Sequence, residues 1–421
     1  MAAKTQPQMT IDKDQARRFL LIQQSLYPPR QFTSPDDILA FFERVGCIQF
    51  DPVNVVGPNP DLVLQARVRG YRPEILDNLL YRDRLLWDGM DKVQSIYLAS
   101  DWPYFERRRQ ANRDNHWFPQ EQPVKLQPLI LEMIRERGPL CSLDLERQEK
   151  IGGFWGVPIR AERAALENLY NMGVLGIHHR VGSRRYFDLV ERLLPGEILA
   201  APDPHATVEA HQDWHVLRRI RSMGLAHPGA GEHWGGMSGM KTPERRAALE
   251  RLLQRGEVVC LAVAEIHGQV YYIHAADLAL LQSAASPAVE PPQAALIAPL
   301  DNLIWQRDLV RALFDFDYVW EVYKPAHQRQ FGHYTLPILY GERFIGRCEP
   351  VFQSKTGRLV MRGWWWQPDA VVDDPMQAAL GECLREFTAY LGAERLEWQP
   401  GLENDPLIGP LIHLLETPPA G

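Results

Sequence analysis

The chain has few cysteines, no long apolar run and no apolar stretch among its first residues. Its five cysteines are scattered along 421 residues without a Cys-x-x-Cys pair, which argues against a disulfide framework or a structural zinc site and favours a reducing compartment. No stretch of 18 apolar residues is present, so we expect no membrane span. The first residues lack the apolar core of a secretory signal, and we therefore expect a cytoplasmic protein.

Motifs for cofactor chemistry are also missing. There is no Walker A sequence, and the Gly-Ala-Gly of residues 229–231 lacks the last glycine and the preceding strand of a dinucleotide fingerprint. His211 and His215 have the spacing of a zinc-binding helix, but Gln212 stands where a metalloprotease needs glutamate. We expect no metal, no nucleotide cofactor and no other cofactor.

Length and charge fit a protein of several folded domains. Hydrophobic residues make up 45% and charged residues 24% of the chain, which is ordinary for folded proteins, and this length accommodates about three or four domains. The net charge of −7 argues against a protein that coats nucleic acid unspecifically. Local basic surfaces remain compatible with it, because binding depends on how charges are distributed.

Two segments resemble each other, and each consists of a helix end followed by two apolar strands. They span residues 168–189 and 251–273. Gly173 and Gly256 stand where a helix end favours a positive φ, while Gly182 and Gly268 mark the hairpin turns. Before the first hairpin, the sequence predicts a helix at 125–137, a short capped helix at 142–145 and a recognition helix at 159–172, with the wing at 174–190. This order is typical of a winged helix-turn-helix, a module that also serves plain protein binding.

The N-terminal region repeats this pattern less regularly. Helices are predicted at 13–26, 36–45, 59–68 and 73–81, and a hairpin at 85–98. We therefore predict three tandem winged-helix domains, which span residues 10–115, 120–200 and 204–288.

A change in composition after Ser283 predicts a linker over residues 284–292. Strands are predicted beyond it at 318–323, 332–339, 344–352 and 359–366, followed by an amphipathic helix at 375–390. Closely spaced antiparallel strands are typical of a small barrel or a curled sheet, and we predict a β-barrel domain over residues 293–421. The predicted fold class is α+β, with three winged helices and a C-terminal β-barrel.

One short segment combines an amide and a carboxylate. Residues 47–51, Cys-Ile-Gln-Phe-Asp, predict a strand that stops at Pro52. Because side chains alternate along a strand, Gln49 and Asp51 are expected on the same face, about 6–7 Å apart at their Cα atoms. Such a pair can position water and face a positive charge. The alternative is structural, with Asp51 organising a turn and Gln49 bonding a backbone group.

Three groups of polar and basic residues are candidates for binding DNA. They are Arg107, Arg108 and Arg109 on a predicted helix, His178, His179, Arg180, Arg184 and Arg185 on the predicted wing, and His327, Gln328, Arg329 and Gln330 between two predicted strands. Cationic side chains on a helix or wing can contact phosphates, and a polar hairpin tip can enter a groove. The alternatives are a solvated charged face and an ordinary exposed turn.

Several motifs point to one family. They are Ile-Gln-Phe-Asp-Pro-Val-Asn-Val-Val from residue 48, Pro-Asp-Leu-Val-Leu-Gln-Ala-Arg from residue 60, Pro-Leu-Asp-Asn-Leu-Ile-Trp-Gln-Arg from residue 299, Leu-Phe-Asp-Phe-Asp-Tyr from residue 313 and Tyr-Lys-Pro-Ala from residue 323. In this order, over nearly the whole chain, they resemble the winged-helix DNA glycosylases of the AlkZ/YcaQ type. The resemblance is weakest across residues 204–285.

The resemblance implies three winged helices and a β-barrel in a C-shape around double-stranded DNA with alkylated or crosslinked bases. Gln49-Phe50-Asp51 is similar to the Gln-x-Asp branch of the family's catalytic motif, which implies excision of N7-alkylated purines and unhooking of interstrand crosslinks. Many relatives have Tyr-Trp-x-His-Glu-Ala in the first wing, whereas residues 87–93 here read Trp-Asp-Gly-Met-Asp-Lys-Val. We expect a monofunctional, monomeric enzyme, and the alternative is a non-enzymatic winged-helix regulator.

Overall fold

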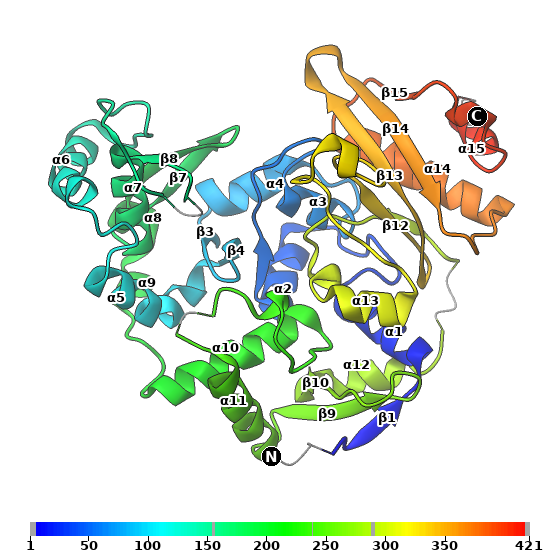
Figure 1. The fold of residues 1–421 in the computed structure, drawn as a ribbon, viewed down its shortest axis with the longest axis horizontal. Coiled ribbons are helices and arrows are strands. Elements are labelled where there is room, and N and C mark those ends of the chain that lie inside the picture. The colour runs from blue at the N-terminus through cyan, green and yellow to red at the C-terminus, as the bar shows by residue number, and fades with distance from the viewer. Residues whose placement is uncertain (1–5, 154–155, 238, 288–290, 417–421) are drawn as a thin grey trace. The chain divides into compact units, whose positions relative to one another are not determined.

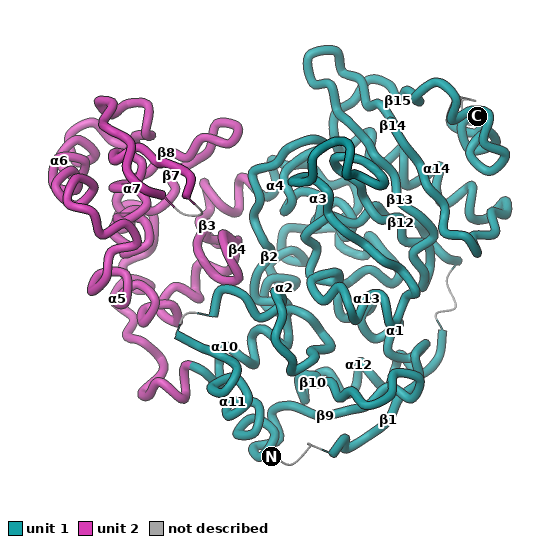
Figure 2. Tube along the Cα trace, viewed as in Figure 1, with its two compact units in different colours: residues 1–76, 212–421 teal, residues 77–211 magenta. Residues whose placement is uncertain are grey.

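The structure is a computed structural model that describes residues 6–153, 156–237, 239–287 and 291–416. The chain forms two compact units, one from residues 1–76 and 212–421 and the other from the continuous stretch 77–211 (Figure 2). The four predicted domain ranges stay predictions. Residues 288–290 of the predicted linker and 417–421 of the last range lie outside the described residues. In the part of the chain that is described, no helix is long and apolar enough to cross a membrane.

A three-stranded sheet in the first unit joins the N-terminal region to residues far along the chain. Strand β1 (Met9–Ile11) pairs in parallel with β9 (Val258–Val263), which pairs antiparallel with β10 (Tyr271–His274) (Figure 1). Helices α1 (Lys13–Gln23) and α12 (Leu278–Ser283) share a buried apolar core with this sheet. Other helices of this unit are α2 (Pro35–Val45), α3 (Asn59–Gln65), α11 (Thr242–Gln254), α13 (Arg307–Phe314) and α15 (Gly409–Glu416), while α4 (Pro73–Asp77) and α10 (Val208–Met223) cross its boundaries.

A five-stranded sheet forms the C-terminal part of the first unit. Its order is β11 (Ala294–Leu296), β12 (Leu336–Tyr340), β13 (Arg343–Gln353), β14 (Arg358–Trp366) and β15 (Arg395–Trp398). The first four strands are antiparallel, and β15 runs parallel to β14. Helix α14 (Asp374–Tyr390) packs on β11 (Figure 1). In the described residues the edge strands β11 and β15 do not pair with each other, so the sheet is a half-barrel, which lies between the two predicted alternatives of a small barrel and a curled sheet.

The second unit contains the predicted recognition helix of residues 159–172, which is α7, and the predicted wing of residues 174–190, which is the β7–β8 hairpin. Its helices are α5 (Glu106–Asp114), α6 (Glu121–Arg137), α7 (Ala161–Asn171), α8 (Val190–Leu193) and α9 (Gly196–Ala200), and its hairpins are β3 (Leu86–Met90) with β4 (Gln94–Leu98), β5 (Lys150–Ile151) with β6 (Ile159–Arg160), and β7 (Leu175–Val181) with β8 (Arg184–Leu189). Helices α6 and α7 and the β7–β8 hairpin share one apolar core. The assignment of three winged-helix domains stays a prediction.

The predicted glycine positions are confirmed. Gly173 and Gly256 have φ of 77° and 70°, and the turn residues Gly182 and Gly268 have φ of 60° and 74°. A side chain would strain the backbone at these values, which explains why both helix–hairpin segments carry glycine there.

Two local predictions are wrong. The predicted helix at 142–145 is a turn, in which the Asp144 carboxylate accepts a hydrogen bond from the Cys141 backbone N–H at 2.7 Å. The predicted strand at 318–323 is a loop, and the next strand begins at Leu336 rather than at residue 332. In that loop the buried Tyr318 hydroxyl donates to the Thr335 carbonyl at 2.6 Å, directly before β12.

Candidate active site

The Gln49–Asp51 segment follows a helix whose ends are well defined. Helix α2 starts with a capping box in which Ser34 and Asp37 exchange side-chain-to-backbone hydrogen bonds. It ends at Gly46, which has a φ of 76° and turns the chain directly into β2 (Cys47–Gln49). The first residues of β2 are fully buried, whereas Gln49 is half-buried. The strand is therefore anchored inside the unit and becomes accessible at Gln49.

The predicted strand is two residues too long, because β2 ends at Gln49. Asp51 lies after the strand, half-buried, and its Oδ1 accepts a hydrogen bond from the Val53 backbone N–H at 2.9 Å. This is the turn that the structural alternative expected for an aspartate before proline. The turn fixes the direction of the Asp51 carboxyl group while using one of its two oxygens.

Two buried asparagines hold β2 in place. Asn59 donates its Nδ2 hydrogen to the Gln49 carbonyl at 2.7 Å and accepts a bond from the Leu300 backbone N–H at 3.1 Å. Asn302 donates to the Cys47 carbonyl at 3.0 Å. Both asparagines are 1% exposed, so their bonds are shielded from water. These positioning residues were not singled out as site residues, although both lie beside or within the motifs that carry the family resemblance.

A buried ion pair supports the same region. The Arg67 guanidinium binds both carboxylate oxygens of Asp301 at 2.8 and 2.9 Å, and both side chains are 0% exposed. Arg67 also donates to the carbonyls of Gln24 and Val63. Because Asp301 accepts from the Leu303 N–H as well, the two charges are well solvated by protein groups. Because Asp301 caps the short 3-10 helix Asn302–Ile304, the pair holds Asn302 in place.

The environment of Asp51 is electrostatically unbalanced. Burial raises the pKa of its carboxyl group, and the Val53 N–H opposes this rise. No basic side chain among the described residues forms an ion pair with Asp51. The carboxylate is close enough to Tyr323 and Tyr334 to add to the rise that burial causes in the pKa of each phenol. An uncompensated carboxylate of this kind favours a positively charged partner.

Tyr323 and Tyr334 differ in accessibility. The Tyr334 side chain is 1% exposed, whereas Tyr323 is 78% exposed. The Trp320 ring makes edge contacts with both, at centroid distances of 5.6 Å to Tyr323 and 6.0 Å to Tyr334. An aromatic series therefore leads from the core of the unit to an exposed ring near Asp51.

The loop that carries Tyr323 is organised by one buried carboxylate. Glu321 is 2% exposed and accepts backbone N–H bonds from Gln330, Phe331 and Gly332, at 2.8 to 3.4 Å, and a bond from the Lys324 ammonium at 2.9 Å. Burial acts to raise the pKa of Glu321, but these bonds outweigh it and lower the pKa to about 2. The Glu321 carboxylate thus joins the start of the loop to its far end at residues 330–332.

The predicted DNA-binding residues of this loop lie on its surface. His327, Gln328 and Gln330 are exposed, and the half-buried Arg329 donates to the Lys324 carbonyl at 2.8 Å. They occupy a short 3-10 turn and its flank, not a hairpin tip between two strands. The structure therefore places them in the same loop as Tyr323, which lies near Asp51.

The predicted basic residues of the second unit are largely engaged within it. Arg107 pairs with Asp203, Arg109 with Glu106, Arg180 with Asp88 and Arg185 with Glu167, while Arg108 donates to the carbonyls of Met90 and Asp91. On the wing, the His178 and His179 rings lie 2.8 Å apart at their Nδ1 atoms and His179 stacks on Tyr186, whereas Arg184 is exposed. DNA binding by these residues stays a prediction.

The residues described contain no group of three or more His, Cys, Asp or Glu side chains that could hold a metal ion. The Asp51 region combines a half-buried carboxylate, a half-buried amide at the end of β2 and the exposed Tyr323 ring.

Comparison with known proteins identifies the class. The family model for AlkZ-like DNA glycosylases matches residues 42–390, and the chain belongs to this family. Its fold is similar to that of the DNA glycosylase AlkZ of Streptomyces sahachiroi, with a TM-score of 0.60 and 14% sequence identity over 93% of this chain and 100% of that chain. The protein is thus a DNA glycosylase, and its substrate is DNA.

Proposed function

We propose that this DNA glycosylase hydrolyses the N-glycosidic bond of N7-alkylated purines and unhooks interstrand crosslinks, with Asp51 and Gln49 as its catalytic residues. The observation that carries the proposal is the half-buried Asp51 carboxylate, which has no ion-pair partner among the described residues and lies in the turn directly after the firmly held strand β2. Gln49 occupies the last position of that strand, and its backbone is fixed by Asn59.

The chemistry of the lesion explains why these two groups suffice. A guanine alkylated at N7 is cationic and leaves without protonation by a general acid. What remains is an oxocarbenium-like sugar and a water molecule to capture it. The Asp51 carboxylate would stabilise the sugar cation and orient or deprotonate the water, and the Gln49 amide would hold the water or the deoxyribose. Water capture leaves an abasic site, which makes the enzyme monofunctional.

The exposure of the site supports crosslinked substrates. A base that is covalently tied to the opposite strand cannot enter a closed pocket of the kind that receives a flipped base. Asp51 is half-buried, and the neighbouring Tyr323 is 78% exposed. We infer that the Tyr323 ring stacks on a base or sugar of the damaged strand, since such stacking contributes about 1–3 kcal/mol per base.

Base release from a duplex with one N7-methylguanine tests the proposal. Asp51→Asn should lower the single-turnover rate by about 10²–10⁴-fold and Gln49→Ala by a smaller factor, because positioned acid–base and electrostatic groups contribute on that scale. Asp369→Asn, an exposed carboxylate of the same unit, serves as the matched control. Undiminished release by both site variants would refute the catalytic assignment. A crosslinked duplex assayed in parallel tests the unhooking activity separately.

A further inference from the structure

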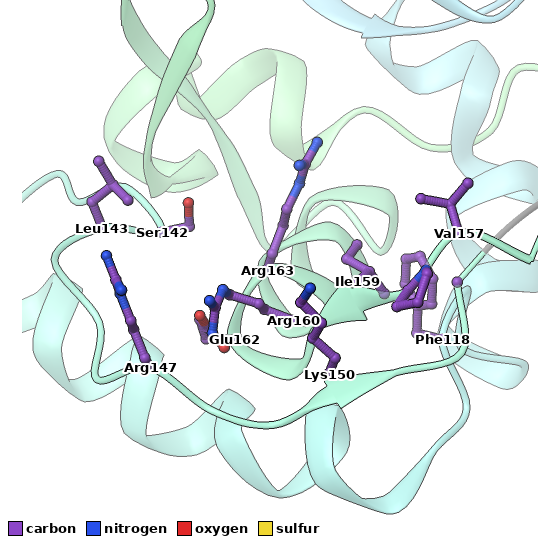
Figure 3. Close-up of a pocket in the computed structure, with 12 residues that line it drawn as sticks. Phe118, Ser142, Leu143, Arg147, Lys150, Val157, Ile159, Arg160, Glu162 and Arg163 are labelled. Carbon is purple, nitrogen blue, oxygen red and sulfur yellow. The ribbon is translucent and has the colours of Figure 1, made fainter.

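A cavity of about 690 Å³ lies beside the N-terminal end of α7 in the second unit (Figure 3). Four cationic side chains line it: Arg147, Lys150, Arg160 and Arg163. Arg147 and Lys150 come from the segment before and within β5, and the other two come from β6 and α7 (Figure 3). Two separate stretches of chain therefore contribute positive charge to one concavity.

The single carboxylate of the lining does not neutralise this charge. Glu162 is 3% exposed and accepts a bond from the Gln148 backbone N–H at 3.1 Å. The Glu162 carboxylate is therefore buried and occupied by a backbone hydrogen bond, whereas all four cationic side chains are exposed. The net charge of the lining is therefore positive.

These cations are also weakly engaged by the protein. Arg147 and Lys150 form no ion pair within the described part of the chain. Arg163 lies 4.0 Å from Glu167, a carboxylate that already pairs with Arg185, and Arg160 donates to a backbone carbonyl at 3.4 Å. The contrast with the paired arginines of α5 and the wing is clear, because an unpaired cation in a concave surface attracts anions more strongly.

The rest of the cavity wall is apolar. Leu143 and Val157 line it and are 62% and 66% exposed. A free inorganic anion makes no favourable contact with apolar side chains. A sugar–phosphate backbone, by contrast, presents charged phosphates and apolar deoxyribose faces together. The lining therefore matches a nucleic-acid backbone better than a small anion.

We propose that this cavity binds a backbone phosphate of double-stranded DNA through Arg147, Lys150, Arg160 and Arg163, of which Lys150 and Arg160 are cross-strand partners in the β5–β6 hairpin. The proposal rests on the protein acting on duplex DNA. It assigns phosphate anchoring to residues that no basic run in the sequence marks, since they are spread over 17 positions among acidic and apolar neighbours.

Salt-dependent binding to undamaged duplex DNA tests the proposal. The variants are Arg147→Gln/Lys150→Gln and Arg160→Gln/Arg163→Gln, and the matched control is Arg135→Gln/Arg137→Gln at the exposed end of α6. Each lost phosphate contact should reduce the slope of log affinity against log salt by about 0.9, which is about eightfold in affinity near 0.1 M salt. The control should bind as the wild type does, with an unchanged salt slope.

Unchanged affinity and slope in both cavity variants would overturn the proposal, as would an equal loss in the control. Thermal unfolding of each variant reports whether the fold is intact, and exposed side chains are expected to leave it so. Tight binding of inorganic phosphate together with unchanged DNA affinity would assign the cavity to a free phosphate compound and also overturn the proposal. Because the duplex is undamaged, the result is independent of whether Asp51 and Gln49 catalyse base release.

Discussion

Replacing Glu321 by glutamine, a side chain of nearly the same shape, should destabilise the loop that carries Tyr323. The variant keeps one oxygen acceptor but loses the negative charge that three backbone N–H groups and Lys324 solvate. A fall in pKa from 4.5 to about 2 corresponds to about 3 kcal/mol of differential stabilisation of the carboxylate. Glu321→Gln should therefore reduce the local stability of this loop by about 2–3 kcal/mol near neutral pH.

The lowered pKa of Glu321 also determines how the stability of the loop changes with pH. A carboxyl whose pKa is lower in the folded than in the unfolded protein stabilises the fold above its unfolded pKa. The contribution of Glu321 should thus be complete above about pH 5 and should disappear as the pH falls from about 4.5 towards about 2. The difference between wild type and Glu321→Gln should shrink over the same range.

Amide hydrogen exchange measured by mass spectrometry resolves the loop directly. Amides of Gln330, Phe331 and Gly332 should exchange about 30–150-fold faster in the variant near neutral pH, since 2–3 kcal/mol corresponds to that factor. Glu250→Gln serves as the control, because it makes the same isosteric substitution and removes the same negative charge at an exposed position on α11. Equal protection in wild type and Glu321→Gln, or a difference that persists undiminished in acid, would refute the assigned role of the carboxylate.

Three further predictions concern the site and its support. Asp301→Asn should cost about 3–5 kcal/mol of unfolding free energy in urea titrations, because Arg67 would keep an uncompensated buried charge; a loss below about 1 kcal/mol would contradict this. If the Asp51 carboxylate is catalytic as proposed, the acid limb of kcat/KM for base release should lie above the ordinary aspartate pKa, since burial raises the pKa of Asp51; a limb that is unchanged in Asp51→Asn would point to another group. Tyr323→Ala should raise KM about 5–100-fold while Tyr323→Phe stays near wild type, because stacking uses the ring and not the hydroxyl; equal effects of both variants would exclude stacking.

The sequence predicts correctly those helices and hairpins whose pattern of apolar residues and turn residues lies within one short segment. Helices α1 and α2 and the β3–β4 hairpin lie within a few residues of their predicted bounds. Strand β1 was missed, because three residues carry almost no periodic signal and its partner Leu261 stands opposite Met9, hundreds of residues later in the chain. Pairing over such a distance is decided by tertiary packing rather than by local propensity.

The same limit applies to the charged residues. The runs at Arg107–Arg109 and on the wing drew attention because they are dense in sequence, yet Arg109 and Arg180 are paired with carboxylates. The role of Glu321 was not predicted, because most of its partners are backbone N–H groups, which every residue except proline has. Counting charges along a chain identifies where they are but not which of them remain available.

The parallel pairing of β1 with β9 has a consequence for how the chain is made. Synthesis releases the N-terminal strand early, but its neighbour in the sheet becomes available only after residue 263 has left the ribosome. The continuous unit of residues 77–211 is complete before that point and can fold as a nascent domain. In the unit that contains Asp51, by contrast, β1 stays without its partner until β9 has been translated.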